Sequence, residues 1–342
     1  MKFLLRADGD SIQGTGHVMR CLTIGEALVS RGHTVELMTN RIDVPWLADA
    51  ISQTGMPWLE TEIDDLSPAR IEERSPDWVV ADSYRFDPGE ISRLNERIPV
   101  LALIDGDDRG VRATVYLDQN VGAELLPHSA HVARSLLAGA EYALVRDAIL
   151  EQRRGQPWQP LGRLPSVLSF MGGSDSTGAS VAVARALSPL LDGLELTVIA
   201  PESLHAELVE AFGEDRRPTI ISPTAELPRI LGTTDIVLSA AGTSAWDVCA
   251  LGIPSVLVAV VDNQLSSLQQ AEARALALAI DAVTDPGAIE RELAELVNRL
   301  TASEELRRSL SDACLSTIDG LGKVRVVERL EQLTAQHGGS HQ

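Results

Sequence analysis

Short runs of apolar residues alternate along the chain with stretches whose apolar positions recur at helical spacing. In the first half the apolar runs lie at residues 2–7, 34–38, 78–81, 100–104 and 114–117, and in the second half at 166–170, 196–200, 219–222, 236–239 and 255–260. Short continuous apolar runs separated by helical segments are typical of strands buried in a parallel sheet. The pattern therefore predicts two doubly wound α/β domains.

The alternation breaks at residues 149–164, where Pro157 and Pro160 occur, and we place the linker there. This predicts a first domain over 1–148, a second over 165–335 and a tail at 336–342. Residues 285–335 carry amphipathic helical patterns and are expected to form two or three helices that close the second domain. Two Rossmann-like domains facing a central cleft would bring strand ends and helix N-termini to a shared ligand site.

Composition and charge narrow the class of ligand. The 342 residues are 44% hydrophobic and 23% charged, which suits two globular cores. An excess of 49 Asp and Glu over 29 Lys and Arg gives a net charge of −20. This charge argues against a general affinity for nucleic acid or anionic membranes, so a phosphorylated ligand would need locally placed donors.

The cysteines and the N-terminus indicate a cytoplasmic protein. Cys21, Cys249 and Cys314 are far apart and lack metal-ligand spacing, which predicts buried thiols in a reducing compartment. The chain opens on an apolar strand without a signal-peptide pattern, and no run of 18 apolar residues occurs. We therefore expect no membrane insertion, and the absence of a His, Asp and Glu grouping leads us to expect no metal or other cofactor.

The segment after the first strand is the strongest candidate for chemistry. Gly14, Gly16 and His17 stand where a helix begins, and unpaired amides with the positive end of the helix dipole favour an anion there. The same dipole lowers the pKa of an imidazole, so His17 could act as a base. Met19 replaces the third glycine of a dinucleotide fingerprint. Two interpretations stay open: a ligand loop, or a tight turn followed by a polar helix start.

Two loops in the second half could receive a nucleotide. Gly172, Gly173, Ser174 and Asp175 follow a predicted strand and open a helix, so their amides and hydroxyls could cradle a diphosphate. A second loop repeats this arrangement and places a carboxylate in the first helical turn, where it could bind the ribose hydroxyls; its candidates are Ala241, Gly242, Thr243, Ser244 and Asp247. Such residues most often cap helices, and the occurrence of two such loops in one domain favours the ligand interpretation.

Other candidates carry weaker signals. Asp105, Asp107 and Asp108 could form a carboxylate pair or a metal site, but beside Arg109 they are more often solvated or ion-paired. His33 is expected in a turn, and His128 and His131 on the surface. Trp246 is as compatible with a core anchor as with a base-stacking platform.

Several motifs together resemble a known family. They are Arg6-Ala7-Asp8, residues 14–22 with the pattern GTGHVMRCL, Asp82-Ser83-Tyr84, residues 139–146, Gly172 to Asp175, residues 241–247 and Asp262-Asn263-Gln264. Over residues 1–280 the chain is similar to the UDP-2,4-diacetamido-2,4,6-trideoxy-β-L-altropyranose hydrolases of pseudaminic acid biosynthesis. That family is related to spore-coat polysaccharide proteins and, more distantly, to GT-B glycosyltransferases.

The resemblance implies a GT-B fold and a UDP-sugar substrate. UDP would be held mainly by the C-terminal domain, and water would cleave the bond between sugar C1 and the phosphate oxygen with inversion and without a metal. His17 would transfer the proton, and Asp8, Tyr84 and Asn263 would border the sugar. The implied binding residues are Gly14, Gly16, Arg20, the two glycine-rich loops, Asn263 and Gln264.

Three departures from the family pattern, and two other functions, stay open. Ser83 stands where the family has histidine, Asp247 replaces the usual glutamate, and Ala245 replaces a hydroxyl residue. The same cleft could serve a glycosyltransferase that uses an alcohol acceptor in place of water. A nucleotide-sugar binding module without catalysis is the third possibility, and would leave His17 dispensable.

Overall fold

A computed structural model describes residues 1–12, 14–62, 67–153, 164–213 and 218–338. The chain divides into two compact units: unit 1 combines Met1–Val145 with the segment that begins at Gly320, and unit 2 is Arg146–Asp319. Most of the predicted linker and the last four residues of the predicted tail lie outside the described residues. No helix among the described residues combines the length and the apolar composition needed to cross a bilayer.

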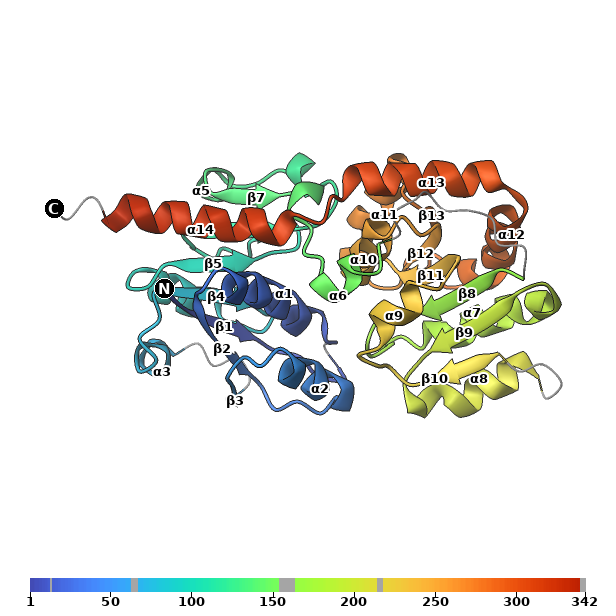
Figure 1. The fold of residues 1–342 in the computed structure, drawn as a ribbon, viewed down its shortest axis with the longest axis horizontal. Coiled ribbons are helices and arrows are strands. Elements are labelled where there is room, and N and C mark those ends of the chain that lie inside the picture. Colours follow the sequence, from blue (N-terminus) through green and yellow to red (C-terminus); the bar gives the residue numbers. More distant parts are fainter. Residues whose placement is uncertain (13, 63–66, 154–163, 214–217, 339–342) are drawn as a thin grey trace. The chain divides into compact units, whose positions relative to one another are not determined.

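Unit 1 is built on a parallel sheet of seven strands (Figure 1). The strands are β1 (Lys2–Ala7), β2 (Thr34–Thr39), β3 (Trp58–Glu60), β4 (Trp78–Asp82), β5 (Val100–Leu103), β6 (Val115–Asp118) and β7 (Leu136–Ala138). Their order, β3-β2-β1-β4-β5-β6-β7, reverses direction between β1 and β4. The five predicted strands of this half are confirmed, and the short β3 and β7 were not predicted.

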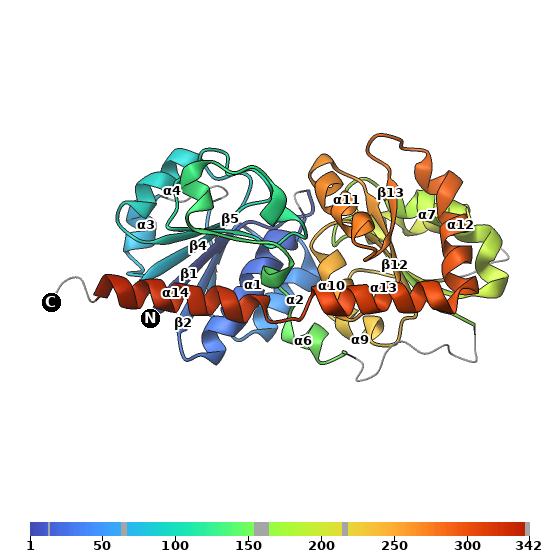
Figure 2. The same cartoon turned by 90° about the horizontal axis from the view of Figure 1, so that it is seen from above.

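Helices cover both faces of this sheet because successive strand residues point to opposite sides. The helices are α1 (Gly16–Ser30), α2 (Pro45–Gln53), α3 (Pro68–Glu72), α4 (Pro88–Asn95) and α5 (Ala130–Ala133), with 3-10 turns η1 (Ala123–Leu125) and η2 (Ala140–Tyr142). Phe3 and Leu5 belong to the core beneath α1 and α2. Leu4 belongs to the core beneath α3 and α4, on the opposite face in Figure 2.

The last helix, α14 (Gly322–Gly338), corrects the predicted domain boundary. We expected residues 165–335 to form one domain, but α14 belongs to unit 1. Val326, Val327 and Leu330 are fully buried in the core that α1 also lines. Amphipathic spacing shows that a helix has a buried face, but it does not show which sheet that face covers. Residues 336–338 of the predicted tail are the end of this helix.

A partly buried hydrogen bond anchors α14 to the sheet and provides a first prediction. Trp78 Nε1 donates to Thr334 Oγ1 over 2.8 Å. Thr334→Val leaves this indole N–H without its acceptor, and we expect a loss of about 1–3 kcal/mol in the free energy of unfolding. Thr334→Ser keeps the hydroxyl and serves as the control. Equal stability of the two variants in urea titration would contradict the anchoring role.

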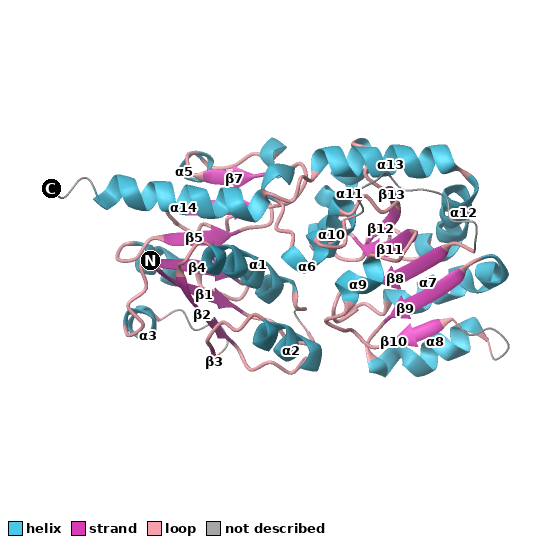
Figure 3. Ribbon diagram, viewed as in Figure 1, coloured by secondary structure: helices cyan, strands magenta, loops and turns pink. Residues whose placement is uncertain are grey.

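Unit 2 repeats the architecture with six parallel strands (Figure 3). The strands are β8 (Ser166–Phe170), β9 (Glu195–Ile199), β10 (Thr219–Ile221), β11 (Ile236–Ala240), β12 (Ser255–Ala259) and β13 (Leu278–Asp281). Their order, β10-β9-β8-β11-β12-β13, places the reversal between β8 and β11. Five of these strands were predicted and β13 was not.

The helices of unit 2 bury their apolar faces against this sheet and against each other. They are α6 (Asp147–Leu150), α7 (Ala179–Leu187), α8 (His205–Phe212), α9 (Leu227–Leu231), α10 (Ser244–Ala250), α11 (Leu265–Ala273), α12 (Ala288–Ala302) and α13 (Glu304–Thr317), with 3-10 turns η3 (Ser188–Gly193), η4 (Glu202–Leu204) and η5 (Asp262–Gln264). α7, α8 and α12 share one core with alternate residues of the strands.

Cys21, Cys249 and Cys314 are buried free thiols, as expected.

Candidate active site

The candidate residues of unit 1 gather at the carboxyl edge of its sheet. Asp8 follows β1, Asp82 ends β4, Asp105 follows β5, and α1 begins with Gly16 and His17 after the loop that leaves β1. β1 and β4 are the neighbouring strands where the sheet order reverses. In open α/β sheets, ligands bind outside the carboxyl ends of the strands at this reversal.

Arg20 joins two of these strand ends through buried ion pairs. Its Nε and Nη2 donate to Asp82 over 2.9 and 2.7 Å, and its Nη1 and Nη2 donate to Asp105 over 2.7 and 3.1 Å. The Arg20 side chain is 4% exposed. The resemblance assigned Arg20 to ligand binding, but two carboxylates already occupy its guanidinium. We therefore reassign it to the internal framework of the site.

The cluster formed by Arg20, Asp82 and Asp105 carries two negative charges against one positive charge. Burial alone would raise the pKa of Asp105, but attraction to Arg20 and hydrogen bonds from Arg20, Tyr84 and Asn120 hold that pKa well below its ordinary value. Arg20 is likewise held in its charged form, because the two carboxylates raise its pKa despite burial. An excess of negative charge therefore faces the start of α1.

His17 lies beside this cluster and is 7% exposed. Burial is the main cause that lowers its pKa below 6.5; Asp82 and Asp105 oppose the shift and Arg20 adds to it. The His17 ring meets the Tyr84 ring in a T-shaped contact, with centroids 4.7 Å apart and planes at 86°. At neutral pH the imidazole is therefore neutral and can accept a proton, and nearby carboxylates can stabilise the cation that results.

Asp8 adds a further buried carboxylate to this edge. Its Oδ1 is paired with Arg6 Nη1 at 2.5 Å, and both side chains are fully buried. Its Oδ2 is buried and has no hydrogen-bond partner among the described residues. Buried oxygens of this kind are seldom left without a donor, so Asp8 Oδ2 is an acceptor at this edge whose donor the described residues do not supply.

The glycines before α1 form a turn. Gly14 has a φ of +91°, and its N–H and C=O both bond to the backbone of Asp10. Gly16 is the first residue of α1. Gly14 therefore forms a turn. Ligand binding by the backbone amides at the start of α1 stays a prediction.

The nucleotide candidates of unit 2 lie in loops that follow three neighbouring strands of the sheet. Gly172 to Asp175 follow β8, Ala241 to Thr243 follow β11, and Asp262 to Gln264 follow β12. Gly172 has a φ of +87°, which favours glycine. A Cβ added at Gly242 would lie 3.5 Å from Gln264 Nε2, so the second and third loops are neighbours. The sequence motifs therefore meet at the strand reversal of unit 2.

The side chain of Asp175 caps a helix, and the predicted ligand role of its backbone amide stays a prediction. Its carboxylate accepts hydrogen bonds from the amides of Ala179 and Ser180, over 3.0 and 3.1 Å, at the start of α7. It is 5% exposed, and burial raises its pKa. The capping interpretation holds for this residue. Diphosphate binding in this loop would rest on the backbone amides of Gly172 to Asp175 and on the Ser174 hydroxyl.

Asp247 lies in the first turn of α10, as predicted, and is largely buried. Arg146 Nη2 is 3.4 Å from Asp247 Oδ2. This pairing connects two segments of the family-like pattern that lie far apart in the sequence. The neighbouring Trp246 is 1% exposed and anchors the core, which excludes the stacking platform.

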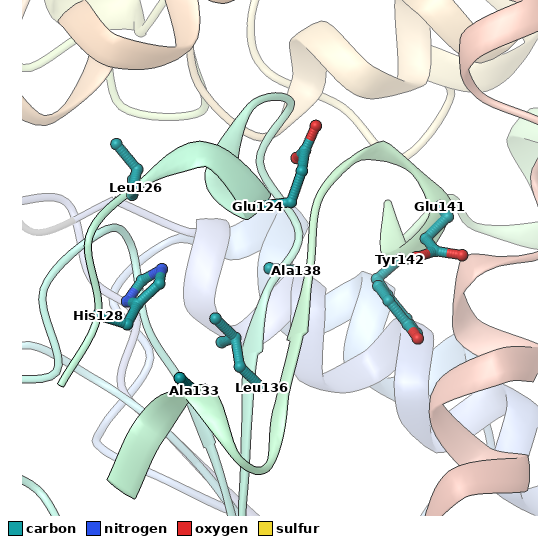
Figure 4. A pocket seen from close by; sticks show the side chains of 8 residues that line it. All are labelled: Glu124, Leu126, His128, Ala133, Leu136, Ala138, Glu141 and Tyr142. Atoms are coloured by element: carbon teal, nitrogen blue, oxygen red, sulfur yellow. The ribbon is translucent and has the colours of Figure 1, made fainter. Parts of the chain in front are cut away.

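Two further features of unit 1 are a pocket beside β7 and the ion pair of Asp105. Figure 4 shows a pocket beside β7, lined by Glu124, Leu126, His128, Ala133, Leu136, Ala138, Glu141 and Tyr142. None of the predicted site residues lines it. Asp105 is ion-paired, as favoured above, but with Arg20 rather than Arg109. Within the described residues no group of three or more His, Cys, Asp or Glu side chains could hold a metal ion.

Comparison with known proteins shows the fold. No protein-family model matches the chain. The S. aureus MnaA-UDP co-structure superposes with a TM-score of 0.69 at 14% identity, over 98% of this chain and 97% of that chain. The crystal structure of Acinetobacter baumannii MurG matches with a TM-score of 0.60 at 15% identity, over 97% of this chain and 100% of that chain. The glycotransferase of kitacinnamycin matches with a TM-score of 0.64 at 16% identity, over 97% of this chain and 98% of that chain. The fold is GT-B-like.

Curated proteins give two partial matches. A stretch of 139 residues is 33% identical to the UDP-N-acetylglucosamine--N-acetylmuramyl-(pentapeptide) pyrophosphoryl-undecaprenol N-acetylglucosamine transferase of Sorangium cellulosum (strain So ce56), covering 39% of this chain and 33% of that protein. A stretch of 242 residues is 23% identical to the spore coat polysaccharide biosynthesis protein SpsG of Bacillus subtilis (strain 168), covering 69% of this chain and 66% of SpsG. The matches thus span a third and about two thirds of these relatives.

Proposed function

We propose that this chain hydrolyses a UDP-linked amino-deoxy sugar of the UDP-2,4-diacetamido-2,4,6-trideoxyhexose type, in nonulosonic acid or surface polysaccharide biosynthesis in the cytoplasm. The observation that carries the proposal is His17: a buried imidazole with a lowered pKa, at the start of α1 and at the strand reversal of unit 1. The motif resemblance supplies the substrate class.

In the proposed reaction, water attacks C1 of the sugar and His17 accepts a proton from that water. A bond forms between C1 and the water oxygen as the bond between C1 and the phosphate oxygen breaks. The electron pair leaves with UDP. Asp82 and Asp105 stabilise the imidazolium, since they are the carboxylates that raise the pKa of His17 most. Asp8 and Tyr84 would border the sugar, as the motif resemblance implies.

The loops of unit 2 would receive the nucleotide. Backbone amides after β8 and β11, together with the Thr243 and Ser244 hydroxyls, offer donors to the two phosphates, and stabilise the charge that develops on the leaving group. Asn263 and Gln264 follow β12 beside this loop. SpsG is named as a spore coat polysaccharide biosynthesis protein, which is compatible with this role.

A glycosyltransferase is the second candidate. The relative that is 33% identical over 139 residues is named as an N-acetylglucosamine transferase. An alcohol acceptor would then take the place of water at C1, and His17 would deprotonate the acceptor.

The experiment that separates these two functions is UDP release from a panel of UDP-sugars by the purified chain, in water and without acceptor. The panel includes UDP-linked 2,4-diacetamido-2,4,6-trideoxyhexoses. Release of UDP with an equal amount of free sugar supports the hydrolase. Tight UDP binding without release, followed by turnover once a polysaccharide-type acceptor is added, supports the transferase.

The pH dependence follows from the state of His17. A base must be unprotonated, so kcat/KM should rise as the pH rises through the His17 pKa and then reach a plateau. Because burial lowers this pKa below 6.5, the midpoint of the rise should lie below pH 6.5. A profile of kcat/KM from about pH 4.5 to about pH 8 measures this midpoint. A rate that instead increases toward low pH would exclude a neutral His17 as the base.

Asp247 provides a test of nucleotide binding. If its carboxylate binds the ribose, Asp247→Asn should raise the Kd of UDP by about tenfold, the effect of one lost charged hydrogen bond. Calorimetric titration measures the Kd, and an unfolding curve checks the effect of the weakened pair with Arg146. Glu272→Gln, an exposed carboxylate on α11, is the control. An unchanged Kd in Asp247→Asn would rule out the ribose contact.

A further inference from the structure

Tyr84 is held more firmly than its exposure suggests. Its side chain is 44% exposed, yet its hydroxyl donates to Asp105 Oδ2. Arg109 donates to the backbone carbonyls of Tyr84 and Ser83, over 2.6 and 2.8 Å, and its guanidinium carbon lies 5.6 Å from the centroid of the Tyr84 ring. Both the ring and its backbone are therefore fixed.

The fixed ring sets the surroundings of His17. The two rings meet at 86° with centroids 4.7 Å apart, so a rotation of Tyr84 would open space beside the imidazole. A terminal ring torsion of histidine has only a broad intrinsic preference. The orientation of the imidazole consequently depends on the side chains that pack against it, and Tyr84 is one of them.

Asp105 accepts the Tyr84 hydrogen bond on an oxygen that also pairs with Arg20. Its Oδ1 accepts from Arg20 Nη1 at 2.7 Å and from Asn120 Nδ2 at 2.8 Å, while its Oδ2 accepts from Arg20 Nη2 at 3.1 Å and from Tyr84. Both oxygens are thus acceptors. An asparagine could turn its oxygen toward Arg20 and Asn120 and donate its amide N–H to the Tyr84 hydroxyl, so it can keep a reversed hydrogen bond to Tyr84. An alanine has no polar side-chain atom and breaks the tether.

We propose that Asp105, itself fixed by Arg20, is a positioning residue that tethers the Tyr84 hydroxyl and thereby holds the His17 imidazole in a single orientation toward its water. The functional part of this inference rests on the proposed hydrolysis of a UDP-sugar. The tether forms part of the site within unit 1 and needs no ligand to be present.

The test is a double-mutant cycle of Asp105→Ala and Tyr84→Phe, measured on the UDP-sugar that the panel identifies. Both single variants break the same hydrogen bond, so each should lower kcat by about tenfold to a hundredfold, the cost of a misplaced catalytic group. In Asp105→Ala, KM should change by less than about twofold, since Asp105 acts on the base and is not among the residues proposed to border the sugar. The double variant should lose no more than the less active single variant, because Tyr84→Phe removes no further contact once Asp105 is gone.

Asp107→Asn is the matched control, because Asp107 lies on the same loop, is exposed, and uses Oδ1 to accept from the Arg109 amide, which asparagine can also do. It should keep the kcat of the unaltered chain. If Tyr84→Phe also keeps that kcat, the tether has no role in positioning His17. Additive losses in the double variant would also overturn the proposal, since they would indicate two independent effects.

A second measurement separates failure of the tether from failure of the proposed function. The carbon-bound ring protons of His17 feel the ring current of Tyr84, so their NMR shifts report the contact without any substrate. In Asp105→Ala and Tyr84→Phe these shifts should move toward those of Tyr84→Leu. If no UDP-sugar is turned over but the shifts move, the proposed function fails and the tether stands. Unmoved shifts in both variants would overturn the tether, whatever the activity.

Discussion

His17→Ala should lower the rate of UDP-sugar hydrolysis by about 10²- to 10⁴-fold, the usual contribution of general base catalysis. The reason is that the imidazole is buried with a lowered pKa, and it alone among the described groups of the α1 start combines a neutral state at pH 7 with the ability to accept a proton. The Kd of UDP should change little, since the candidate nucleotide loops lie in unit 2.

The measurement is kcat by coupled UDP detection, with the UDP Kd determined in parallel. His131→Ala is the control, because His131 is an exposed histidine of unit 1 that lies on α5. It should retain full activity. A His17→Ala variant with more than about a tenth of the original kcat would remove His17 from the chemical step.

Arg20→Met should destabilise unit 1 by about 3–5 kcal/mol, the effect of removing one partner from a buried ion-pair network. Methionine has a similar length but leaves Asp82 and Asp105 buried beside each other without their shared cation. Adding Asp105→Asn removes one of the two stranded charges, so the double variant should recover part of the loss. Urea titration measures both variants.

The pH dependence of this loss has a definite sign. The pKa of Asp105 is held below its unfolded value, so its contribution to stability is present above about pH 4 and disappears as the pH falls toward the folded pKa. The difference between the unaltered chain and Arg20→Met should therefore shrink in acid. Arg97→Met, which breaks an exposed pair with Glu72, should show no measurable loss at any pH. An Arg20→Met variant as stable as Arg97→Met would contradict the framework role.

The sequence was most informative for strands that are buried on both faces. β1, β4 and β11 are such strands, and their continuous apolar runs were recognised. β3 and β7 are three residues long and lie at the sheet edges, so they carry too short a pattern. β13 lies in a run of alternating leucine and alanine, which is also compatible with a helix. The two sheets and their strand content could therefore be predicted, but not all of their edges.

Long-range pairing explains what could not be predicted at the site. Arg20 lies 62 residues from Asp82 and 85 from Asp105, so no local spacing indicates the network. The sequence favoured solvated or ion-paired carboxylates for Asp105, Asp107 and Asp108, with Arg109 as the nearest cation along the chain, and did not indicate Arg20 as the partner of Asp105. Asp175 illustrates a different limit of the sequence. A helix cap and a phosphate-binding loop have the same local sequence pattern, and only the observed hydrogen bonds identify the cap.

The proposed hydrolysis requires that His17 directs water to C1 of a UDP-linked sugar. The most direct test is turnover of the UDP-sugar identified by the panel in ¹⁸O-labelled water, with both products analysed by mass spectrometry. We expect one ¹⁸O atom in the free sugar and none in UDP, and we expect His17→Ala to slow the appearance of this label by about 10²- to 10⁴-fold. Label in the terminal phosphate of UDP would place the attack at phosphorus instead of C1 and would contradict the account.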